Sequence, residues 1–439
     1  MSPLAIGIVS VLVILVVIYA GVHVPFVLGL TSFVGVWLIR GNFDVAVQML
    51  MQAATQGISD YIFGVIPLFV LMGMLVSAAD LGRDSFTVAN QLLRRLPGGL
   101  GVATVAANAV FAAITGVTIA SAAVFSRVAV PEMLKFGYQK RFAVGVVAGS
   151  SVLGMLIPPS ILLIVYALIA EQSVGTMFLA GIGPGLLLTV CFSASIVLAA
   201  IFMPKLVIAD QGKARSVDAA PRLNAAQLLI LMAPTMALIL AVLGGIYGGI
   251  FTATEAGAVG AALALVVAVW RRRMTWQKFW SVLLETGHIT GSVLFIVIAA
   301  TMYSRMLGVS GLPTQIGEMV HSLNASYILI LLIFLGIVLV LGTIIDSVSI
   351  LLITVPLFIP LLKPFDVNLV WFGIVAVLAT EVGLLTPPFG ISCFVVRSTL
   401  ADYDITLGDV FTGSAPFALV MLVVIGLIVV FPQIVLAFI

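Results

Sequence analysis

Two stretches, GSSVLGMLIPPS at residues 149–160 and TEVGLLTPPFG at residues 380–390, decide the fold of this chain. Each ends in or contains a Pro-Pro pair, Pro158-Pro159 and Pro387-Pro388, inside a long apolar segment. A proline inside a helix removes a backbone hydrogen-bond donor and clashes with the preceding turn, so an α-helix cannot continue through either pair. The sequence therefore predicts two long apolar helices that are broken at matching positions.

The composition restricts the class of protein. Hydrophobic residues make up 62% of the 439 residues and charged residues only 8%, which excludes soluble folds and indicates many membrane-spanning helices. The first apolar segment, residues 4–20, lacks a basic leader and a small-residue cleavage site, so we expect a membrane helix rather than a secretory signal. Cys191 and Cys393 stand alone in apolar sequence, so neither a disulfide nor a metal cluster is expected.

A second matched piece lies upstream of each Pro-Pro pair. GVTIASAAVFSRVAVP occupies residues 116–131 and GTIIDSVSILLITVP occupies residues 342–356, each with a polar start inside apolar sequence. Such pieces are typical of re-entrant hairpins, and non-helical backbone at membrane depth is tolerated only where it is buried in protein or lines a cavity. The predicted segments are a hairpin at 98–134 with a broken helix at 141–170, and a hairpin at 327–362 with a broken helix at 370–400.

The basic residues predict the orientation. If the first hairpin is re-entrant, Arg94 and Arg95 before it lie on the same side as Lys140 and Arg141 after it, together with most other Lys and Arg residues. Cytoplasmic loops carry an excess of Lys and Arg, so this side is predicted to be the cytoplasm. The second hairpin then enters from the opposite side. The expected fold class is an all-α polytopic membrane protein built from two inverted-topology repeats.

The apolar pattern predicts about eleven crossings. Residues 43–59 carry polar side chains at helical spacing and are expected to lie along the interface. We expect an amphipathic stretch at 271–280, a span at 285–303 and a polar connection at 304–324. The predicted parts are N-terminal scaffold helices 1–97, first transport elements 98–203, a cytoplasmic loop 204–224, second scaffold helices 225–324, and second transport elements with a final helix 325–439.

A hairpin tip that faces a broken helix brings together backbone carbonyls, hydroxyls and helix N-termini. Carbonyl and hydroxyl oxygens suit a hard cation such as Na⁺, and helix N-termini suit a carboxylate. Small residues also let membrane helices pack closely, which is the alternative explanation for any one of them. The candidates are Thr115, Gly116, Thr118, Ser121, Ser150, Ser151 and Gly154 in the first half, and Gly342, Thr343, Asp346, Gly383 and Thr386 in the second.

Three of the ionisable residues in or beside these segments are candidates for a role in the site. Asp346 stands in an apolar run, so it is a functional candidate that could cap a helix, bind a cation or carry a proton. Glu381 stands next to the second break. Arg127 could attract an anion, but its separation from the first tip favours a side chain that extends to the cytoplasmic surface.

Four motifs in this order resemble the DctM-type large membrane subunit of tripartite ATP-independent periplasmic (TRAP) transporters: GSSVLGMLIPPS, GGIFTATEAGAVG at 248–260, the hairpin from Gly342 to Asp346, and GLLTPPFG. The resemblance covers essentially the whole chain. It implies an elevator-type transporter of the ion-transporter superfamily in the bacterial inner membrane, which imports an organic acid with a Na⁺ gradient and needs no cofactor. It also implies two partners, a small membrane subunit (DctQ type) and a periplasmic substrate-binding protein (DctP type), and no nucleic acid.

The same resemblance implies which residues hold the ions, because the family binds Na⁺ between each hairpin tip and the facing broken helix. The residues implied for the first Na⁺ site are Thr115, Gly116, Thr118, Gly154, Ile157 and Pro159, and those for the second are Gly342, Thr343, Gly383 and Thr386. The substrate contacts are predicted at Ser121, Ser150, Ser151, Asp346 and Ser347. Val117 departs from the serine that many relatives have, so the first site is expected to use backbone atoms or Thr118.

Two other functions remain open from the sequence. A stand-alone Na⁺- or H⁺-coupled carboxylate symporter of the same superfamily would need no delivery protein. An intramembrane enzyme is the remote alternative, because Tyr403-Asp404 weakly resembles an aspartyl protease motif. That reading lacks a Gly-x-Gly-Asp partner, and Asp404 is expected in a surface loop. The sequence does not predict which organic acid is carried.

Overall fold

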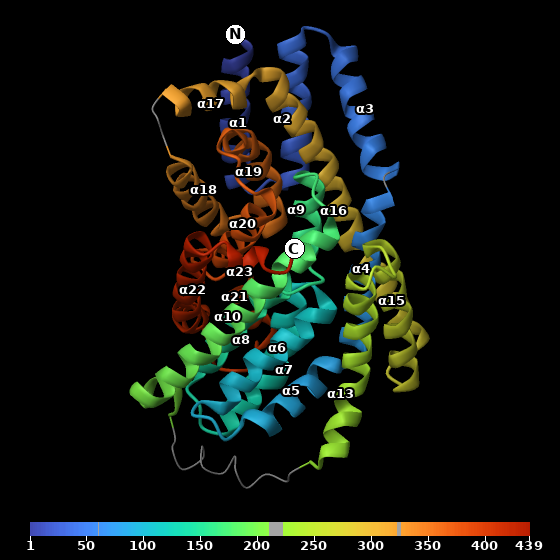
Figure 1. Cartoon of the computed structure of the whole chain (residues 1–439), viewed down its shortest axis with the longest axis vertical. Coiled ribbons are helices and arrows are strands. Elements are labelled where there is room, and N and C mark those ends of the chain that lie inside the picture. Colours follow the sequence, from blue (N-terminus) through green and yellow to red (C-terminus); the bar gives the residue numbers. More distant parts are fainter. Residues whose placement is uncertain (60, 210–222, 323–325) are drawn as a thin grey trace.

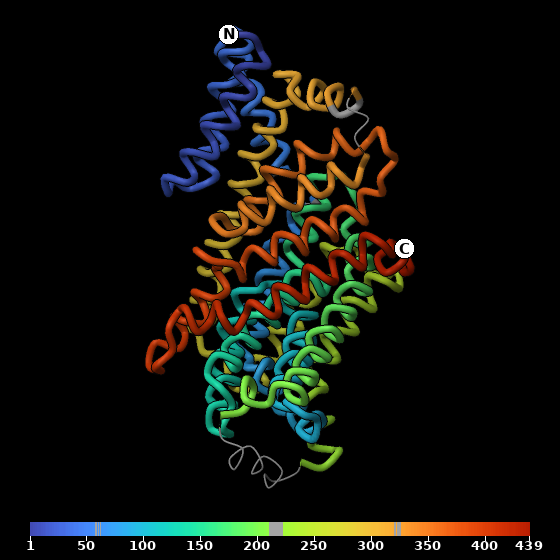
Figure 2. The backbone as a smooth tube through the Cα atoms, turned by 90° about the vertical axis from the view of Figure 1, so that its left-hand side faces the viewer, coloured from blue at the N-terminus to red at the C-terminus, as the bar shows by residue number. Residues whose placement is uncertain are grey.

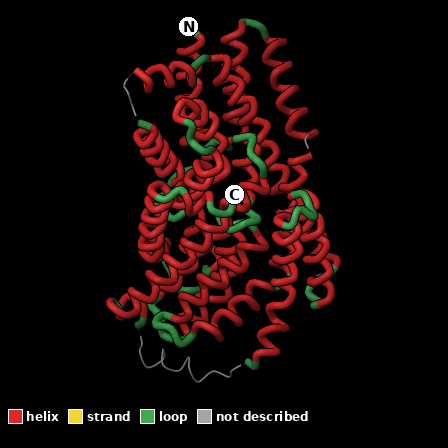
Figure 3. Tube along the Cα trace, in the orientation of Figure 1, coloured by secondary structure: helices red, strands yellow, loops and turns green. Residues whose placement is uncertain are grey.

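The chain folds almost entirely into helices. A computed structural model describes residues 1–59, 61–209, 223–322 and 326–439, and within these ranges it contains no β-strand, only an isolated bridge between Tyr138 and Ile208 (Figure 3). Most helices run side by side at a slant to the longest axis of the molecule (Figure 2). A composition this rich in apolar residues is expected to form long apolar helices, because a helix satisfies its own backbone hydrogen bonds inside a membrane.

Helices from two separate stretches of the chain pack into one group, which we call the scaffold. α16 (Trp276–Ser310) packs against α2 (Val24–Arg40) and α4 (Val65–Ala78), and α15 (Ala253–Trp270) packs along α4. The other members are α1 (Pro3–Tyr19), α3 (Phe43–Ser59), the short η1 (Tyr61–Gly64), α13 (Ala225–Ile239), the π-helical η4 (Leu240–Gly244), α14 (Gly245–Tyr247) and α17 (Leu312–Ser322).

The first half of the chain forms the expected hairpin and broken helix. α6 (Gly99–Thr115) and α7 (Thr118–Lys135) pack against each other and make hairpin 1. The helix that follows is broken at the Pro-Pro pair. Its parts are α8 (Lys140–Ser151), η2 (Val152–Met155) and α9 (Ile161–Ile169), with α10 (Val174–Phe202) and α11 (Pro204–Val207) after them and α5 (Leu81–Leu93) packed along α6. Much of the predicted loop 204–224 lies outside the described residues.

The second half repeats this plan and joins the first. Hairpin 2 consists of α18 (Tyr327–Gly342) and α19 (Ser347–Leu362), which are in contact. The later helices pack against those of the first half, α22 along α8 and α21 along α7. The remaining bounds are η5 (Lys363–Phe365), α20 (Leu369–Gly383), α21 (Ile391–Thr399), α22 (Leu407–Val430) and α23 (Gln433–Leu436). The predicted fold class, with its two matched hairpins and broken helices, is confirmed.

Glycines allow the two halves to approach closely. A Cβ added at Gly145 of α8 would lie 2.1 Å from the carbonyl oxygen of Gly413 in α22, and one added at Gly413 would lie 1.9 Å from that of Arg141. No side chain fits there, so the backbones are in contact as in small-residue membrane packing. We call the elements from α6 to α10 and from α18 to α22, with these helices included, the transport unit (Figure 1).

Length and apolar character set the number of spans. Among the described helices, six are long and apolar enough to cross a membrane, or seven if α4 and α5, bent by 64°, count as one. The arms of hairpin 1 and the parts of both broken helices are not among the six, whereas residues 347–365, the second arm of hairpin 2 together with η5, are one of them. The chain is therefore a multi-pass membrane protein. The sequence predicted about eleven crossings in addition to the two hairpins, which is more than length and apolar character alone identify.

The sequence placed some boundaries incorrectly in the second scaffold stretch. α16 runs without interruption from Trp276 to Ser310, so the expected amphipathic stretch and the expected span belong largely to one helix. The Thr275 side chain accepts a hydrogen bond from the Lys278 amide at 3.3 Å and starts the helix there. No proline lies between Trp276 and Ser310 to interrupt it. The expected polar connection contains α17.

Candidate substrate and cation site

The tip of hairpin 1, residues 115–118, rests on the break of the first broken helix. Gly116 adopts a left-handed conformation with φ of 65°, which turns α6 into α7. The Ile161 amide donates a hydrogen bond to the Gly116 carbonyl at 3.3 Å. A Cβ at Gly116 would lie 2.4 Å from the Pro159 carbonyl oxygen, and one at Gly154 would lie 2.9 Å from the Val117 carbonyl carbon. The tip and the break are therefore in direct backbone contact.

The tip of hairpin 2, residues 342–347, makes the equivalent contact in the second half. The Phe389 amide donates a hydrogen bond to the Thr343 carbonyl at 3.1 Å. A Cβ at Gly342 would lie 2.6 Å from the Gly383 Cα, and one at Gly383 would lie 2.4 Å from the Gly342 Cα. The two breaks each contain a cis Pro-Pro bond. The structure thus brings Gly116, Gly154 and Pro159 together at one tip, and Gly342, Thr343 and Gly383 at the other.

Threonine hydroxyls line both contacts. Thr115, which is 1% exposed, donates its hydroxyl hydrogen to the Phe111 carbonyl at 2.8 Å, and Thr386 donates to the Val382 carbonyl at 2.8 Å. Thr343 donates to the Val340 carbonyl at 2.8 Å. A hydroxyl that donates its hydrogen in this way keeps its lone pairs, so its oxygen can still bind a cation.

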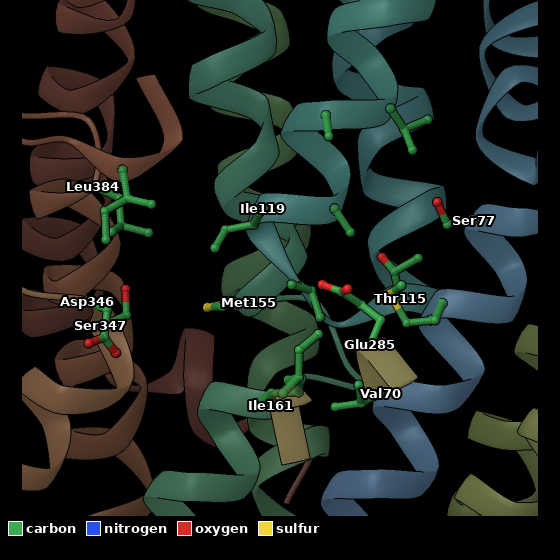
Figure 4. Close-up of a pocket in the computed structure, with 18 of the residues that line it drawn as sticks. Val70, Ser77, Thr115, Ile119, Met155, Ile161, Glu285, Asp346, Ser347 and Leu384 are labelled. Atoms are coloured by element: carbon green, nitrogen blue, oxygen red, sulfur yellow. The ribbon is translucent and has the colours of Figure 1, made fainter. Parts of the chain in front are cut away.

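A cavity of about 620 Å³ opens beside both tips. Figure 4 places Asp346 and Ser347 of tip 2 on one side of it, Thr115 and Glu285 on the other, and Ile119, Met155 and Ile161 between them. The volume is within the usual range for a small-molecule site, and the walls are mostly apolar. The charged residues of the lining are Asp80, Arg83, Arg127, Glu285 and Asp346.

Arg127 lines this cavity along one face of α7. Ile119, Ala120, Ala123 and Val124 share that face, so the cavity follows α7 from the tip towards its carboxyl end. Arg127 is exposed there. Arg127 thus lies at the cavity and is exposed at the same time, so both an interaction with an anion and an extended side chain remain compatible with its position.

Asp346 caps a helix and also faces the cavity. Its Oδ2 accepts a hydrogen bond from the Ser349 amide at 3.0 Å, which identifies it as the N-cap of α19. It also lines a second cavity of about 790 Å³ between hairpin 2 and the turn after α1. Capping and a role in the site are therefore compatible.

Three predicted substrate residues lie elsewhere. Ser150 and Ser151 are fully buried on α8: the Asn108 side-chain amide donates to the Ser150 hydroxyl at 2.6 Å, and Ser151 donates to the Ala148 carbonyl at 2.7 Å. Ser121 is also fully buried, with no hydrogen-bond partner among the described residues. None of the three lines the cavity of about 620 Å³. Ile157 sends its side chain towards Gly185 of α10, so only its backbone is available at the break.

Glu381 is a site residue that the sequence only partly indicated. It is fully buried on α20, yet Thr118 donates to its Oε2 at 2.8 Å and Ser347 donates to its Oε1 at 3.0 Å. Thr118 belongs to tip 1 and Ser347 to tip 2. The signal was an ionisable residue next to the second break, but its partners lie far away in the sequence.

The family model of the tripartite ATP-independent periplasmic transporter, DctM component, matches residues 11–434. The chain belongs to this family. A C4-dicarboxylate TRAP transporter large permease protein of Pseudomonas aeruginosa is 32% identical over 376 residues, covering 85% of this chain and 84% of that protein. The sialic acid TRAP transporter large permease protein of Vibrio cholerae is 30% identical and covers 95% of this chain and 94% of that one. The predicted resemblance is confirmed.

A solved structure shares the fold of this DctM-type subunit. The YdaH transporter of Alcanivorax borkumensis aligns with a TM-score of 0.54 at 16% identity, covering 89% of this chain and 90% of that chain. Identity this low supports the fold alone. A further relative, a C4-dicarboxylate TRAP transporter large permease protein of Rhodobacter capsulatus, is 31% identical and covers 87% of each chain.

The chain is a TRAP large permease subunit and not an enzyme. The relatives are named as transporter permease proteins. Asp404, the residue behind the remote enzyme alternative, has a fully exposed side chain and lies 3.5 Å from Lys140 Nζ. An exposed aspartate paired with a lysine at the surface is unlike a buried catalytic dyad.

Proposed function

We propose that this chain carries an organic acid across the bacterial inner membrane in symport with Na⁺, as the large subunit of a tripartite transporter. The observation that carries the proposal is the pair of tip-to-break contacts, one in each half, beside a cavity of about 620 Å³. Matched discontinuous helices at a repeat interface are where secondary transporters bind substrate and coupling ion.

The chemistry of the tips supports Na⁺ as the coupling ion. The residues at each contact offer backbone carbonyls and threonine hydroxyls, which are neutral hard oxygen ligands. Such ligands suit an alkali cation, and they offer no soft atoms or imidazoles that a transition metal would prefer. The proposed ions lie at Thr115, Thr118 and Gly154 in the first half and at Gly342, Gly383 and Thr386 in the second.

The cavity supports an anionic substrate that contains both polar and apolar parts. Its walls are mostly apolar, while Arg127 supplies a positive charge and Ser347 and Asp346 supply polar contacts near the tips. A carboxylate of the substrate is well suited to pair with Arg127, since a guanidinium binds a carboxylate in two-pronged geometry. Relatives are named for C4-dicarboxylates, sialic acid and 2,3-diketo-L-gulonate, which are acids of different size.

An elevator motion of the transport unit against the scaffold fits the packing. The scaffold helices α2, α4, α15 and α16 pack mainly on one another, and the hairpins and broken helices do the same. The two groups meet where α4 contacts α6 and α9, where α13 contacts α6, and where α16 and α17 contact α19. Rigid-body movement of one repeat element against another is the usual route to alternating access.

The partners follow from the family rather than from this chain. The family is described as one component of a tripartite periplasmic transporter, so two further components are expected. We propose that they are a small membrane subunit and a periplasmic binding protein. The cavity beside the basic end of α7 is proposed to face the cytoplasm, since Lys and Arg are retained there.

Uptake in proteoliposomes tests this function. The chain and its small subunit are reconstituted with an inward Na⁺ gradient, and uptake of labelled organic acids is measured with and without the periplasmic protein encoded beside them. We expect uptake only when both Na⁺ and the periplasmic protein are present, with K⁺ in place of Na⁺ as the control. Uptake without the periplasmic protein would favour the stand-alone symporter, and uptake without Na⁺ would refute the coupling.

A further inference from the structure

Glu381 joins three elements that are far apart in the sequence. It lies on α20, two residues before Gly383, and its side chain is fully buried. Each of its two carboxylate oxygens accepts one hydrogen bond, Oε2 from Thr118 of hairpin 1 at 2.8 Å and Oε1 from Ser347 of hairpin 2 at 3.0 Å. One carboxylate therefore connects both tips to the second broken helix.

The charge of this carboxylate has no cationic partner in the described part of the chain. The ion pairs formed there involve other acids, and no Lys, Arg or His side chain pairs with Glu381. Asp346, the residue before Ser347, is a second acidic group in this region, and its own oxygens accept from Ser349. A buried carboxylate needs a cation or several donors to offset its desolvation, and two neutral hydroxyls offset only part of it.

Among the described residues, Glu381 lacks a cation, and the candidate Na⁺ sites lack an anionic ligand. Their ligands are backbone carbonyls and hydroxyls, so neither site contains a formal negative charge of its own. Thr118, a candidate ligand of the first site, is in direct contact with Glu381, and Gly383 of the second site follows it on the same helix. We propose that Glu381 is the anionic group that both Na⁺ sites share, and that its two hydrogen bonds couple them.

This inference rests on the proposed Na⁺ symport and has a simple chemical basis. A hydroxyl that donates its hydrogen to a carboxylate carries more negative charge on its oxygen, so Thr118 becomes a better cation ligand while it stays bonded to Glu381. An ion at either tip attracts the same carboxylate and orders the hydrogen bond to the other tip. Because such coupling is reciprocal, each Na⁺ raises the affinity for the other.

Direct binding of ²²Na⁺ to the purified complex of large and small subunits tests the proposal without relying on transport. The variant is Glu381→Gln, whose amide keeps the shape and can accept from one hydroxyl while donating to the other. The matched control is Glu132→Gln, which changes a partly exposed carboxylate near Lys135. We expect Glu381→Gln to lower Na⁺ affinity by about fivefold or more and to bring a wild-type Hill coefficient above one down to about one.

The outcomes separate this inference from the function on which it rests. A wild-type complex without saturable Na⁺ binding would refute the Na⁺ coupling itself. A wild-type complex that binds Na⁺, with Glu381→Gln showing the same affinity and Hill coefficient, would overturn only the shared carboxylate. Weakened binding at one site with the other unchanged would overturn it too.

Variants of Thr118 keep the proposal testable if Glu381→Gln fails to fold. Thr118→Ser retains the hydroxyl that bonds to Glu381, whereas Thr118→Ala removes it and leaves the buried carboxylate in place. We expect Thr118→Ser to bind Na⁺ with the cooperativity of the wild type and Thr118→Ala to lose it. Equal cooperativity in the two variants would contradict the coupling.

Discussion

Gly342 and Gly383 set how closely the second tip approaches its broken helix. A Cβ at Gly342 would lie 2.6 Å from the Gly383 Cα, a backbone atom that cannot move aside without shifting α20. We expect Gly342→Ala to lift the tip and to lower Na⁺-dependent uptake by about tenfold or more, since small displacements in a binding geometry have large effects. Gly336→Ala, at a position of the same helix with open space around it, is the control. Equal uptake by the two variants would show that the close contact is unimportant.

Asp346 has two roles that one pair of substitutions can separate. Asparagine is as good an N-cap as aspartate, whereas alanine removes the cap and costs about 1 kcal/mol. We expect Asp346→Asn to keep the melting temperature of the wild type but to lose most Na⁺-dependent uptake, because the negative charge beside the cavity is gone. Asp346→Ala should lose both stability and uptake. Normal uptake in the asparagine variant would reduce Asp346 to a helix cap.

Local signals in the sequence were enough to select Asp346, Thr118 and the tip glycines, because a polar residue in an apolar run or a turn before a helix is visible without tertiary contacts. The hydrogen bonds of Glu381 were not predictable in this way. Its partners come from both halves of the chain, and only the packed fold brings them within 3.0 Å. Ser150 and Ser151 show the opposite limit. Their positions in the sequence suggested substrate contacts, but their hydroxyls donate to backbone carbonyls of their own helix.

The scaffold and the transport unit are in close contact at Gly73 of α4. A Cβ there would lie 2.7 Å from the Thr115 carbonyl oxygen of tip 1. In an elevator motion this tip slides along α4, so a side chain at Gly73 would obstruct it. We expect Gly73→Ala to lower the rate of uptake severalfold while ²²Na⁺ binding at equilibrium remains, and Gly287→Ala in α16, which has open space, to change neither.

If Gly73→Ala lost both uptake and ²²Na⁺ binding, the substitution would instead act on the ion site. The two readouts are therefore needed on the same preparations. Measured melting temperatures of both variants complete the comparison, because a lowered value in Gly73→Ala alone would indicate disrupted packing rather than obstructed movement.

Elements with a strong terminator were predicted well, and elements without one were not. The Pro-Pro pairs predicted both breaks, and the bounds 43–59 of the helix expected along the interface coincide with those of α3. By contrast, α16 passes through polar residues such as Glu285 and His288 without interruption, because neighbouring helices support it. Hydropathy falls at such residues although the helix continues, so a pattern based on apolar runs divides one long helix into several pieces.

The inverted repeat explains why the molecule has two similar tips, but the pairing of its halves needed the structure. α22 lies along α8 and α21 along α7, so helices from both halves pack together to form one transport unit. The sequence shows only that the two plans match. Which helix of one half touches which helix of the other depends on glycine contacts such as Gly145 with Gly413, which carry no local signature.

The direction in which the cavity of about 620 Å³ beside α7 opens is a property of the whole molecule and can be tested with adjacent residues of α7. Ala123 lines the cavity, whereas Ala122 is fully buried. In a background of Cys191→Ser and Cys393→Ser, we expect Ala123→Cys to react with a membrane-impermeant thiol reagent applied from the cytoplasmic side, and Ala122→Cys to remain unlabelled. Added Na⁺ and substrate should slow the reaction, because occupied tips close the space beside α7. Labelling of Ala123→Cys only from the periplasmic side would reverse the orientation that the basic residues predict, and with it the direction of release.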